Sequence, residues 1–474
     1  MAEILLINPP LTSKELYRRG AKATASIIPP LGLASIAAVL EEEGHSVEII
    51  DGIAQNISFS DVVKNAECFE IVGITVLSAF FKRCAELIRA IKKVCKVQII
   101  VGGAHATALP ESLLEVGADY VVLGEGELTI KELVNAILTS SHPIENIQGI
   151  SFKNGGKVIK TKRRPMIENI NSLPLPARHL LPMHKYKTSE ARANRNPSHS
   201  MIVSRGCPGA CSFCCKILFG KKIRCRSPEN IVEEMFLLKD KYNAKEIAFL
   251  DDTFTADFDI VSSVCKLLIN NKFDIPWSCE ARIDTVDREM LQMMKRAGCD
   301  FIAYGVESGS NEVLKSINKK ITKKEIERTI RITQEIGIPI RGYFMLGFVG
   351  ETERQMMDTI NFAIKLNVDV ASFSLLIPFP GTVDYIRASK EEGYFDPEFY
   401  KKVLVPEFNF PDYPIYSPKT VSPERLLTIH KKAYRKYYYR PKIILKEITN
   451  IRDFEGLKRI VKGGITLLKN YRKN

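Results

Sequence analysis

Short apolar runs alternate with longer amphipathic segments along the first 140 residues. The runs have the length and composition of strands buried on both faces of a parallel sheet, and the longer segments repeat their apolar residues at helical spacing. Five such strand–helix units predict a doubly wound α/β sheet. The expected strands are residues 4–7, 46–50, 71–75, 98–101 and 120–123, and the expected helices are residues 31–43, 58–65, 80–94, 110–116 and 127–139.

The same alternation returns between residues 200 and 385. Six strand–helix repeats predict a partial (β/α)6 barrel, in which functional groups gather at the carboxyl ends of the strands. The expected strands are residues 201–204, 246–250, 277–282, 301–305, 340–346 and 371–377, and the expected helices are residues 228–241, 260–270, 288–297, 312–317, 323–336 and 353–366.

The segment between these two regions does not continue the alternation of strands and helices. Asn154-Gly155-Gly156 predicts a hairpin turn between strands at 149–153 and 157–160. A proline-punctuated linker follows, and we expect its histidines, His179, His184 and His199, to face solvent.

The last 89 residues predict a proline-rich strap over the open side of the barrel and then basic helices. One helix is expected at 423–439, and apolar residues recur at helical spacing after Pro441. The chain therefore divides into a doubly wound domain (1–140), a hairpin and linker (141–199), a barrel (200–385), and a strap with a basic helical region (386–474).

Charge is concentrated at one end of this 474-residue chain. The net charge is +13, and residues 421–474 contain 15 Lys/Arg against 4 Asp/Glu. A basic amphipathic element bordered by tyrosines is typical of a membrane surface, but it also fits RNA or a solvated tail packed on its own barrel. We favour peripheral membrane contact over nucleic acid.

The cysteine content indicates the cellular compartment and the role of the thiols. The sequence has 11 cysteines, no export signal at its start, and no apolar run of about 18 residues that would span a membrane. We therefore expect a cytoplasmic protein whose thiols bind metal or pack in cores and do not form disulfides.

Three of the cysteines, Cys207, Cys211 and Cys214, form a C-x3-C-x2-C motif just after the first expected barrel strand. A four-iron cluster normally takes four thiolates, so three leave one iron open to a small molecule. The alternative is a zinc site with Cys215 or Cys225 as fourth ligand. Zinc sites usually show a second cysteine or histidine pair, and the sequence has no histidine between His199 and His430.

This spacing, with Phe213 just before the third cysteine, resembles the radical S-adenosylmethionine (radical SAM) superfamily. The resemblance implies that S-adenosylmethionine binds the open iron and is cleaved reductively to a 5′-deoxyadenosyl radical. It also implies roles for residues at the strand ends: Phe213 packs on the adenine, Glu307 and Ser308 bind the ribose or the methionine amine, Arg282 pairs with the carboxylate, and Gly347 and Gly350 let the adenine approach the backbone. The alternative for Glu307 and Arg282 is an ion pair at the barrel rim.

Small and polar residues also follow the expected strands of the first domain. They are Asn8, Thr75, Ser78, Gly102, Gly103, Gly124 and Glu125. Taken alone, they indicate a nucleotide-like binding domain or a purely structural one. The pattern INPP…PPLGLASIAAVLEEEGHSVEIID…VGIT…VGGAHAT…GEGE resembles the cobalamin-binding domain that precedes many radical SAM barrels. The resemblance implies that these residues bind cobalamin. The D-x-H-x-x-G motif of cobalamin-dependent mutases is missing, and His105 has the wrong context, so the corrinoid is expected to bind without a histidine ligand.

The resemblance to both families predicts a Rossmann-like cobalamin-binding domain, a TIM-type radical SAM barrel and a basic α-helical C-terminal region. It implies a cobalamin-dependent enzyme with a 4Fe-4S cluster and S-adenosylmethionine, similar to the anaerobic Mg-protoporphyrin IX monomethyl ester cyclases and the hopanoid and archaeal lipid-modifying enzymes. Such an enzyme methylates, rearranges or cyclises an unactivated carbon of a lipid-like or tetrapyrrole-like substrate, with a ferredoxin- or flavodoxin-type electron donor.

Two other functions stay open at this point. A tRNA methylthiotransferase uses a similar barrel but needs a second cluster on three N-terminal cysteines, and Cys68, Cys84 and Cys95 lack cluster spacing. The alternative that is not an enzyme is a zinc-bearing nucleic-acid-binding protein.

Overall fold

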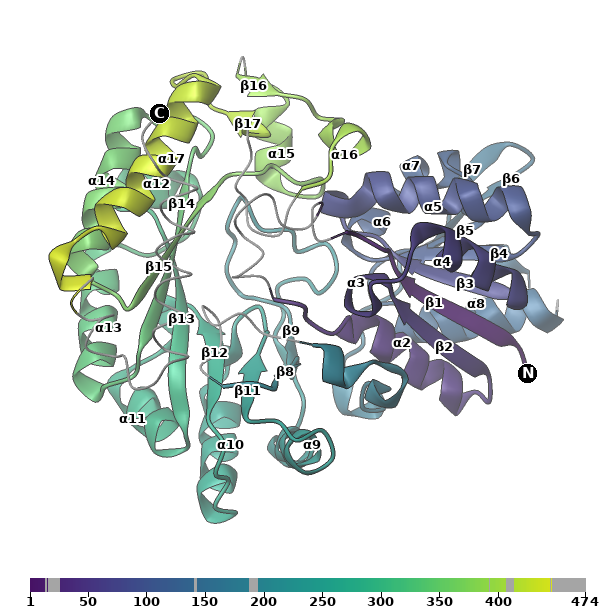
Figure 1. The fold of residues 1–474 in the computed structure, drawn as a ribbon, viewed down its shortest axis with the longest axis horizontal. Helices are drawn as coiled ribbons and strands as arrows, with labels where there is room; N and C mark the ends of the chain where they lie inside the picture. Colours follow the sequence, from purple (N-terminus) through teal and green to yellow (C-terminus); the bar gives the residue numbers. More distant parts are fainter. Residues whose placement is uncertain are drawn as a thin grey trace.

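The computed structural model of the protein describes residues 1–12, 15, 26–139, 143–186, 195–391, 393–405, 413–443 and 445. Two α/β units lie side by side, with the N-terminal sheet on the right of Figure 1 and a half-open barrel on the left. The concave side of the barrel faces the N-terminal unit. None of the helices in the described ranges is long and apolar enough to cross a membrane.

The N-terminal sheet has seven strands in the order β2-β1-β3-β4-β5-β6-β7. The first five in chain order are parallel, and each confirms a predicted strand to within one residue at either end. The predicted hairpin is also confirmed, but it continues this sheet, because its first strand pairs antiparallel with β5. The strands are β1 Glu3–Asn8, β2 Ser46–Asp51, β3 Ile71–Thr75, β4 Gln98–Gly102, β5 Tyr120–Val122, β6 Ile150–Asn154 and β7 Lys157–Lys160.

Helices cover both faces of this sheet, and the five predicted ones are confirmed. Two more, α3 and α6, follow β2 and β4 and were not predicted, because four or five residues show no helical periodicity. Asp51 starts α3 by accepting hydrogen bonds from the backbone N–H groups of Ile53 and Ala54. The helices are α2 Leu31–Glu42, α3 Gly52–Gln55, α4 Phe59–Asn65, α5 Phe81–Val94, α6 Ala104–Ala108, α7 Pro110–Glu115 and α8 Glu127–Thr139.

The barrel sheet has six parallel strands in the order β15-β14-β13-β12-β11-β8, so it is open between β15 and β8. Its strands are β8 Ser198–Met201, β11 Glu246–Phe249, β12 Trp277–Ala281, β13 Cys299–Glu307, β14 Ile340–Leu346 and β15 Val370–Leu375. Its outer helices are α9 Pro228–Asp240, α10 Phe258–Asn270, α11 Arg288–Arg296, α12 Asn311–Ser316, α13 Lys323–Ile336 and α14 Glu353–Leu366.

The prediction for the first barrel strand was wrong. The strand is β8, whereas Ser204 and Arg205 form a short strand, β9, that pairs antiparallel with β10 (Arg224–Cys225). Three of the four residues of β8 are polar yet buried, so no apolar run marks it. The expectation for His199 was also wrong: its side chain lies inside the fold, 3.0 Å from the carbonyl oxygen of Tyr242.

The C-terminal region begins with α15 Val383–Ala388, β16 Tyr394–Phe395, α16 Phe399–Lys402 and β17 Tyr416–Ser417. The predicted helix is α17 Pro423–Tyr438, which packs on the outside of β15 and α14. Its tyrosines face the barrel, since Tyr434 and Tyr438 donate hydrogen bonds to the carbonyl oxygens of Phe373 and Ala371. They therefore do not form the polar border expected of a membrane-surface helix. The basic helical pattern after Pro441 lies almost entirely outside the described residues, as do positions 406–412 of the strap.

A buried ion-pair cluster joins the linker to the barrel. Glu234 of α9 is 1% exposed and accepts hydrogen bonds from Arg178, at 2.7 Å, and from Arg226. Burial raises the pKa of Glu234, but the two guanidinium groups outweigh it and lower the pKa below its ordinary value. The carboxylate is therefore charged at neutral pH and holds the linker on the barrel.

Replacing Glu234 by glutamine should leave two buried guanidinium groups without a counter-charge. We expect the E234Q variant to lose about 3–5 kcal/mol of unfolding free energy, the usual cost of removing one partner from a buried ion pair. Urea unfolding followed by circular dichroism measures this loss. The matched control is E327Q, whose partner Lys365 is exposed and which should lose about 0–1 kcal/mol. Equal losses in the two variants would contradict the proposed role of Glu234.

Candidate active site

The three motif cysteines lie on the loop between β9 and β10, at the carboxyl-terminal side of the barrel. Two glycines shape this loop. Gly206 has φ = +93°, and a Cβ there would lie 2.2 Å from the carbonyl oxygen of Lys222. A Cβ on Gly209 would lie 2.5 Å from Nη1 of Arg282. The glycine between the first two cysteines therefore makes room for a guanidinium group beside the thiols.

The motif thiols have polar partners that act on them unequally. A hydrogen bond with Cys214 is the main cause that lowers the pKa of Cys211 to about 6, and nearby Lys319 and Arg282 contribute. The same interaction raises the pKa of Cys214. Nη1 of Arg282 lies 3.7 Å from Sγ of Cys211, and the Thr253 hydroxyl lies 3.4 Å from Sγ of Cys207. Positive charge beside the thiols is compatible with the thiolates that an iron–sulfur cluster takes as ligands.

The structure shows no closed metal site. In the part of the chain that it describes, no three Cys, His, Asp or Glu side chains converge on one point. The suggested fourth zinc ligands are also otherwise placed: the Cys215 thiol donates to the carbonyl oxygen of Pro380, and Cys225 lies in strand β10. A loop with three thiols fits an open cluster better than a four-ligand zinc site.

The Arg282 side chain follows β12 and points toward the cysteine loop. Asp284 takes one side of its guanidinium group through two contacts of 2.8 Å, and Nη2 also donates to the carbonyl oxygen of Lys319. Although burial opposes it, the hydrogen bond with Asp284 raises the pKa of Arg282. Only Nη1 remains directed toward the thiols.

Glu307 ends β13 with a positive φ of 66° and forms a buried ion pair with Lys319 at 2.8 Å. The pair needs Gly305, since a Cβ there would lie 2.5 Å from the Glu307 carboxylate and 2.8 Å from Nζ of Lys319. Nζ of Lys319 also lies 6.0 Å from the centre of the Phe213 ring. Arg282, Glu307 and Phe213 thus meet around one lysine that the sequence did not single out.

The other residues expected to contact S-adenosylmethionine differ in how much space the structure leaves beside them. The Ser308 hydroxyl is buried against that of Thr359, at 3.1 Å. The space beside Gly350 is open, whereas the space beside Gly347 is filled by Leu426 of α17. Glu351 accepts hydrogen bonds from the backbone N–H groups of Gly347 and Phe348, and burial raises the pKa of its carboxyl to about 8.

A cavity of about 590 Å³ lies between the two units. Asn8 and Thr75 line it from the N-terminal sheet, and Phe213, Met345 and Ser374 line it from the barrel. Most of its other walls are apolar, from residues such as Ile27, Ile28, Leu33, Leu77, Phe80, Leu376, Phe379 and Val405. The carboxyl ends of both parallel sheets therefore open into one shared space.

A second cavity, of about 160 Å³, enters the N-terminal unit between its strand ends. Gly102, Gly103 and Gly124 line it together with Thr75 and Glu125. Gly103 has φ = +109°, and a Cβ there would lie 2.9 Å from the carbonyl oxygen of Val76. Walls made of glycine backbone let a large ligand approach the strand ends closely, which is compatible with part of a bulky cofactor such as cobalamin entering this cavity.

Three residues expected to bind this cofactor have other partners. The Asn8 amide donates to Asp51, and the Ser78 hydroxyl lies 2.9 Å from Nδ1 of His105. Glu125 accepts hydrogen bonds from Arg205 and Arg224, which flank the cysteine loop. Burial raises the pKa of Glu125, but the two arginines outweigh it and lower the pKa. No local pattern in the sequence marks these two arginines, because the contacts join residues at least 80 positions apart.

His105 is buried between Phe81 and Tyr400, and its second ring nitrogen lies 3.1 Å from the Ser112 hydroxyl. Burial lowers the pKa of His105 to about 4, so the ring is neutral at pH 7. His105 lies in α6. No described histidine lines either of the two cavities.

An open cysteine loop facing a ligand-binding α/β unit defines a two-cofactor radical enzyme. Comparisons agree: residues 201–363 match the radical SAM superfamily, and residues 20–134 match the B12 binding domain. The chain is 35% identical over 467 residues to an uncharacterized methyltransferase of Pyrococcus horikoshii, which covers 97% of each protein. The chain therefore belongs to the cobalamin-binding radical SAM superfamily, and it uses a 4Fe-4S cluster, S-adenosylmethionine and cobalamin.

Two more distant relatives differ in activity. The chain is 28% identical over 460 residues to the cytidylyl-2-hydroxyethylphosphonate methyltransferase of Streptomyces wedmorensis, covering 84% of this chain and 83% of the relative. It is 25% identical over 437 residues to the anaerobic magnesium-protoporphyrin IX monomethyl ester cyclase of Rubrivivax gelatinosus, covering 89% and 76%. The structure of the cobalamin-dependent radical enzyme OxsB has the same fold, with a TM-score of 0.75 at 17% identity, over 99% of this chain and 72% of that one.

The cysteine assignment predicts a clear difference between neighbouring thiols. In the C211A variant, prepared without oxygen, iron should fall from about four per chain to less than one. Formation of 5′-deoxyadenosine should stop as well. The control is C215A, which changes the adjacent exposed cysteine and should keep its iron. Iron and sulfide analysis checks both variants, and retention of four irons in C211A would contradict the assignment.

Proposed function

We propose that this enzyme methylates a carbon of a largely apolar substrate bound in the cavity between its two units. The observation that carries the proposal is that cavity, because expected cofactor-binding residues from both units, Asn8, Thr75 and Phe213, line it. When bound, the cluster and S-adenosylmethionine supply radical chemistry and cobalamin supplies the methyl group. The protein contributes position, orientation and exclusion of water.

In this proposal, Cys207, Cys211 and Cys214 would ligate the cluster. Arg282 reaches the methionine carboxylate through Nη1 alone, since Asp284 already occupies the other side of the guanidinium group. Phe213 packs on the adenine from the barrel side of the cavity. Glu307 acts through its ion pair with Lys319, which fixes a positive charge beside the thiolates.

Gly102, Gly103, Gly124 and Thr75 would hold cobalamin with their backbone and small side chains. Ser78 would serve this site only indirectly, by fixing the neutral His105 ring. Glu125 would orient the cysteine loop through Arg205 and Arg224. Since no described histidine lines either cavity, cobalamin would bind without a histidine ligand.

Methyl transfer is favoured over cyclisation by the most similar of the relatives above, which is named as a methyltransferase and matches along almost the whole chain. The apolar walls favour a lipid-like or tetrapyrrole-like substrate over a polar one. A one-electron donor of the ferredoxin or flavodoxin type would approach the cluster loop, where Lys221 is exposed.

Methyl transfer leaves a distinct set of products. Under reducing, oxygen-free conditions with cobalamin and an apolar substrate, the enzyme should form both 5′-deoxyadenosine and S-adenosylhomocysteine. Label from the S-adenosylmethionine methyl group should appear in the organic extract. Mass spectrometry measures all three products. Formation of 5′-deoxyadenosine with an unlabelled, dehydrogenated or ring-closed product would instead show cyclase-type chemistry.

The basic C-terminal region would contact the surface of an anionic membrane. Lys431, Lys432 and Lys436 are exposed on α17, and a basic residue near an anionic membrane contributes about 1 kcal/mol to binding. We expect the protein to bind vesicles of anionic phospholipid at low salt and to release them at high salt. Changing these three lysines to glutamate should weaken binding at least tenfold in a co-sedimentation assay. Equal binding to neutral vesicles would rule out this electrostatic contact.

A further inference from the structure

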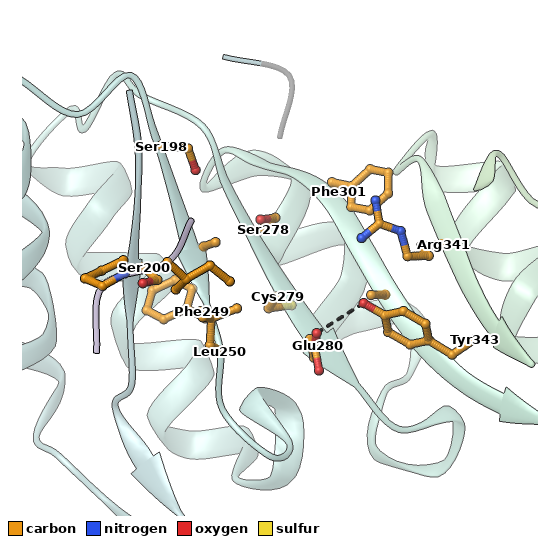
Figure 2. A pocket seen from close by; sticks show the side chains of 14 residues that line it. Ser198, Ser200, Phe249, Leu250, Ser278, Cys279, Glu280, Phe301, Arg341 and Tyr343 are labelled. Carbon is orange, nitrogen blue, oxygen red and sulfur yellow. Dashed lines mark hydrogen bonds between the residues drawn. The ribbon is translucent and has the colours of Figure 1, made fainter. Parts of the chain in front are cut away.

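The inside of the barrel contains a small cavity with a buried arginine in its wall, and the proposed chemistry does not use it. Its volume is about 50 Å³, enough for a few water molecules or one carboxylate or phosphate group. Figure 2 shows it lined by Ser200 of β8, Ser278 and Glu280 of β12, and Arg341 and Tyr343 of β14, together with apolar side chains such as Phe249 and Phe301. Such a cavity inside a barrel normally fills with packed side chains.

Arg341 is the unusual member of this group. It is 5% exposed, and two of its guanidinium nitrogens, Nε and Nη2, are buried without a hydrogen-bond partner. Its neighbours are aromatic faces, with the Phe301 ring centre at 5.1 Å and that of Tyr343 at 6.0 Å. Burying a charge without a partner is costly, so the arrangement calls for a bound anion or water.

The register of the strands explains why there is room beside Arg341. Glu280, Ala303 and Arg341 lie in one row across β12, β13 and β14. The alanine in the middle leaves a gap between the carboxylate and the guanidinium group, which are about 10 Å apart at the backbone. Glu280 is held on its own side, where it accepts a hydrogen bond from the Tyr343 hydroxyl at 3.2 Å (Figure 2).

Two serines line other walls of the cavity. The Ser200 hydroxyl, which lies across the cavity from Arg341 (Figure 2), is buried without a hydrogen-bond partner, and Ser278 is 6% exposed. The guanidinium group itself is the group that suits a carboxylate or a phosphate. The Glu280 carboxylate would keep such an anion at the Arg341 side of the cavity.

The small cavity lies in line with the cavity between the units. Ile28 lines both. Along β14, Arg341 and Tyr343 line the barrel cavity, and Met345 lines the larger one. Four residues of strand span about 13 Å. A molecule of that length could place one end at Arg341 and the other beside Met345 and Phe213.

We propose that Arg341 binds an anionic end group, a carboxylate or a phosphate, of the substrate whose apolar part lies in the cavity between the units. This inference rests on the proposed function and adds the class of substrate: an apolar molecule with an acidic group about 13 Å from the carbon that reacts. Arg341 is a binding residue in this scheme and takes no part in the chemistry.

Three eight-carbon probes test the proposal on the full-length enzyme with its cofactors. Isothermal titration calorimetry compares octanoate, octyl phosphate and the neutral octanol. The wild type should bind at least one of the two anions at least tenfold more tightly than octanol, and their order tells carboxylate from phosphate. In the R341M variant this preference should disappear while octanol still binds, and R341K should keep part of it.

A control variant and a stability measurement distinguish the loss of an anion site from the loss of the fold. R331M changes an exposed arginine on α13 and should keep the preference for anions. R341M should unfold at the same temperature as the wild type or higher, since it removes a buried unpaired charge, and octanoate or octyl phosphate should raise the unfolding temperature of the wild type only. An anion preference that survives in R341M would overturn the proposal, as would a wild type that binds octanol as tightly as the anions. Label transfer is scored separately, so a loss of methyl transfer with the anion preference intact would refute only the proposed function.

Discussion

The carboxylate of Glu125 sets the geometry on which the active site depends. It leaves the end of β5 in the N-terminal unit and binds Arg205 and Arg224, the two arginines on either side of the cysteine loop. Arg205 also pairs with Glu127. Ion pairs at this depth gain little net stability, because desolvation offsets the attraction, but they allow only one arrangement of the charged groups. The carboxyl ends of the two parallel sheets are thereby held face to face, and the cavity between them follows from this constraint.

That constraint also explains why chemistry-bearing groups from distant parts of the chain share one space. Each parallel sheet places its loops at the carboxyl ends of its strands, so each presents its ligand-binding edge to the other. The linker and the strap also connect the two units. Glu234 of the barrel holds the linker through Arg178, and α16 of the strap packs against α5 of the N-terminal unit. Apolar side chains from both units line the space between these edges.

The strands and helices could largely be predicted from the sequence, because buried parallel strands are apolar runs and amphipathic helices keep their period. The failures have physical reasons. β8 was missed because its buried residues are serine and histidine, which satisfy their polarity through tertiary contacts. The cysteine motif is visible in the sequence, but no local pattern marks Lys319, Arg205 or Arg224, whose partners lie on other elements. Glu125 and Ser78 were correctly placed at strand ends, whereas the groups that their side chains contact could not be foreseen.

Two buried cations beside the cysteine loop act on the same thiol. Arg282 and Lys319 are both nearly buried and lie close enough to lower the pKa of Cys211. In a protein without these cations, three thiolates brought together would repel one another and take up protons. With them, positive charge lies beside Cys211, and the same groups would balance the negative charge of a bound cluster. The buried lysine beside Glu307 therefore adds to the positive charge at the loop that we propose holds the cluster.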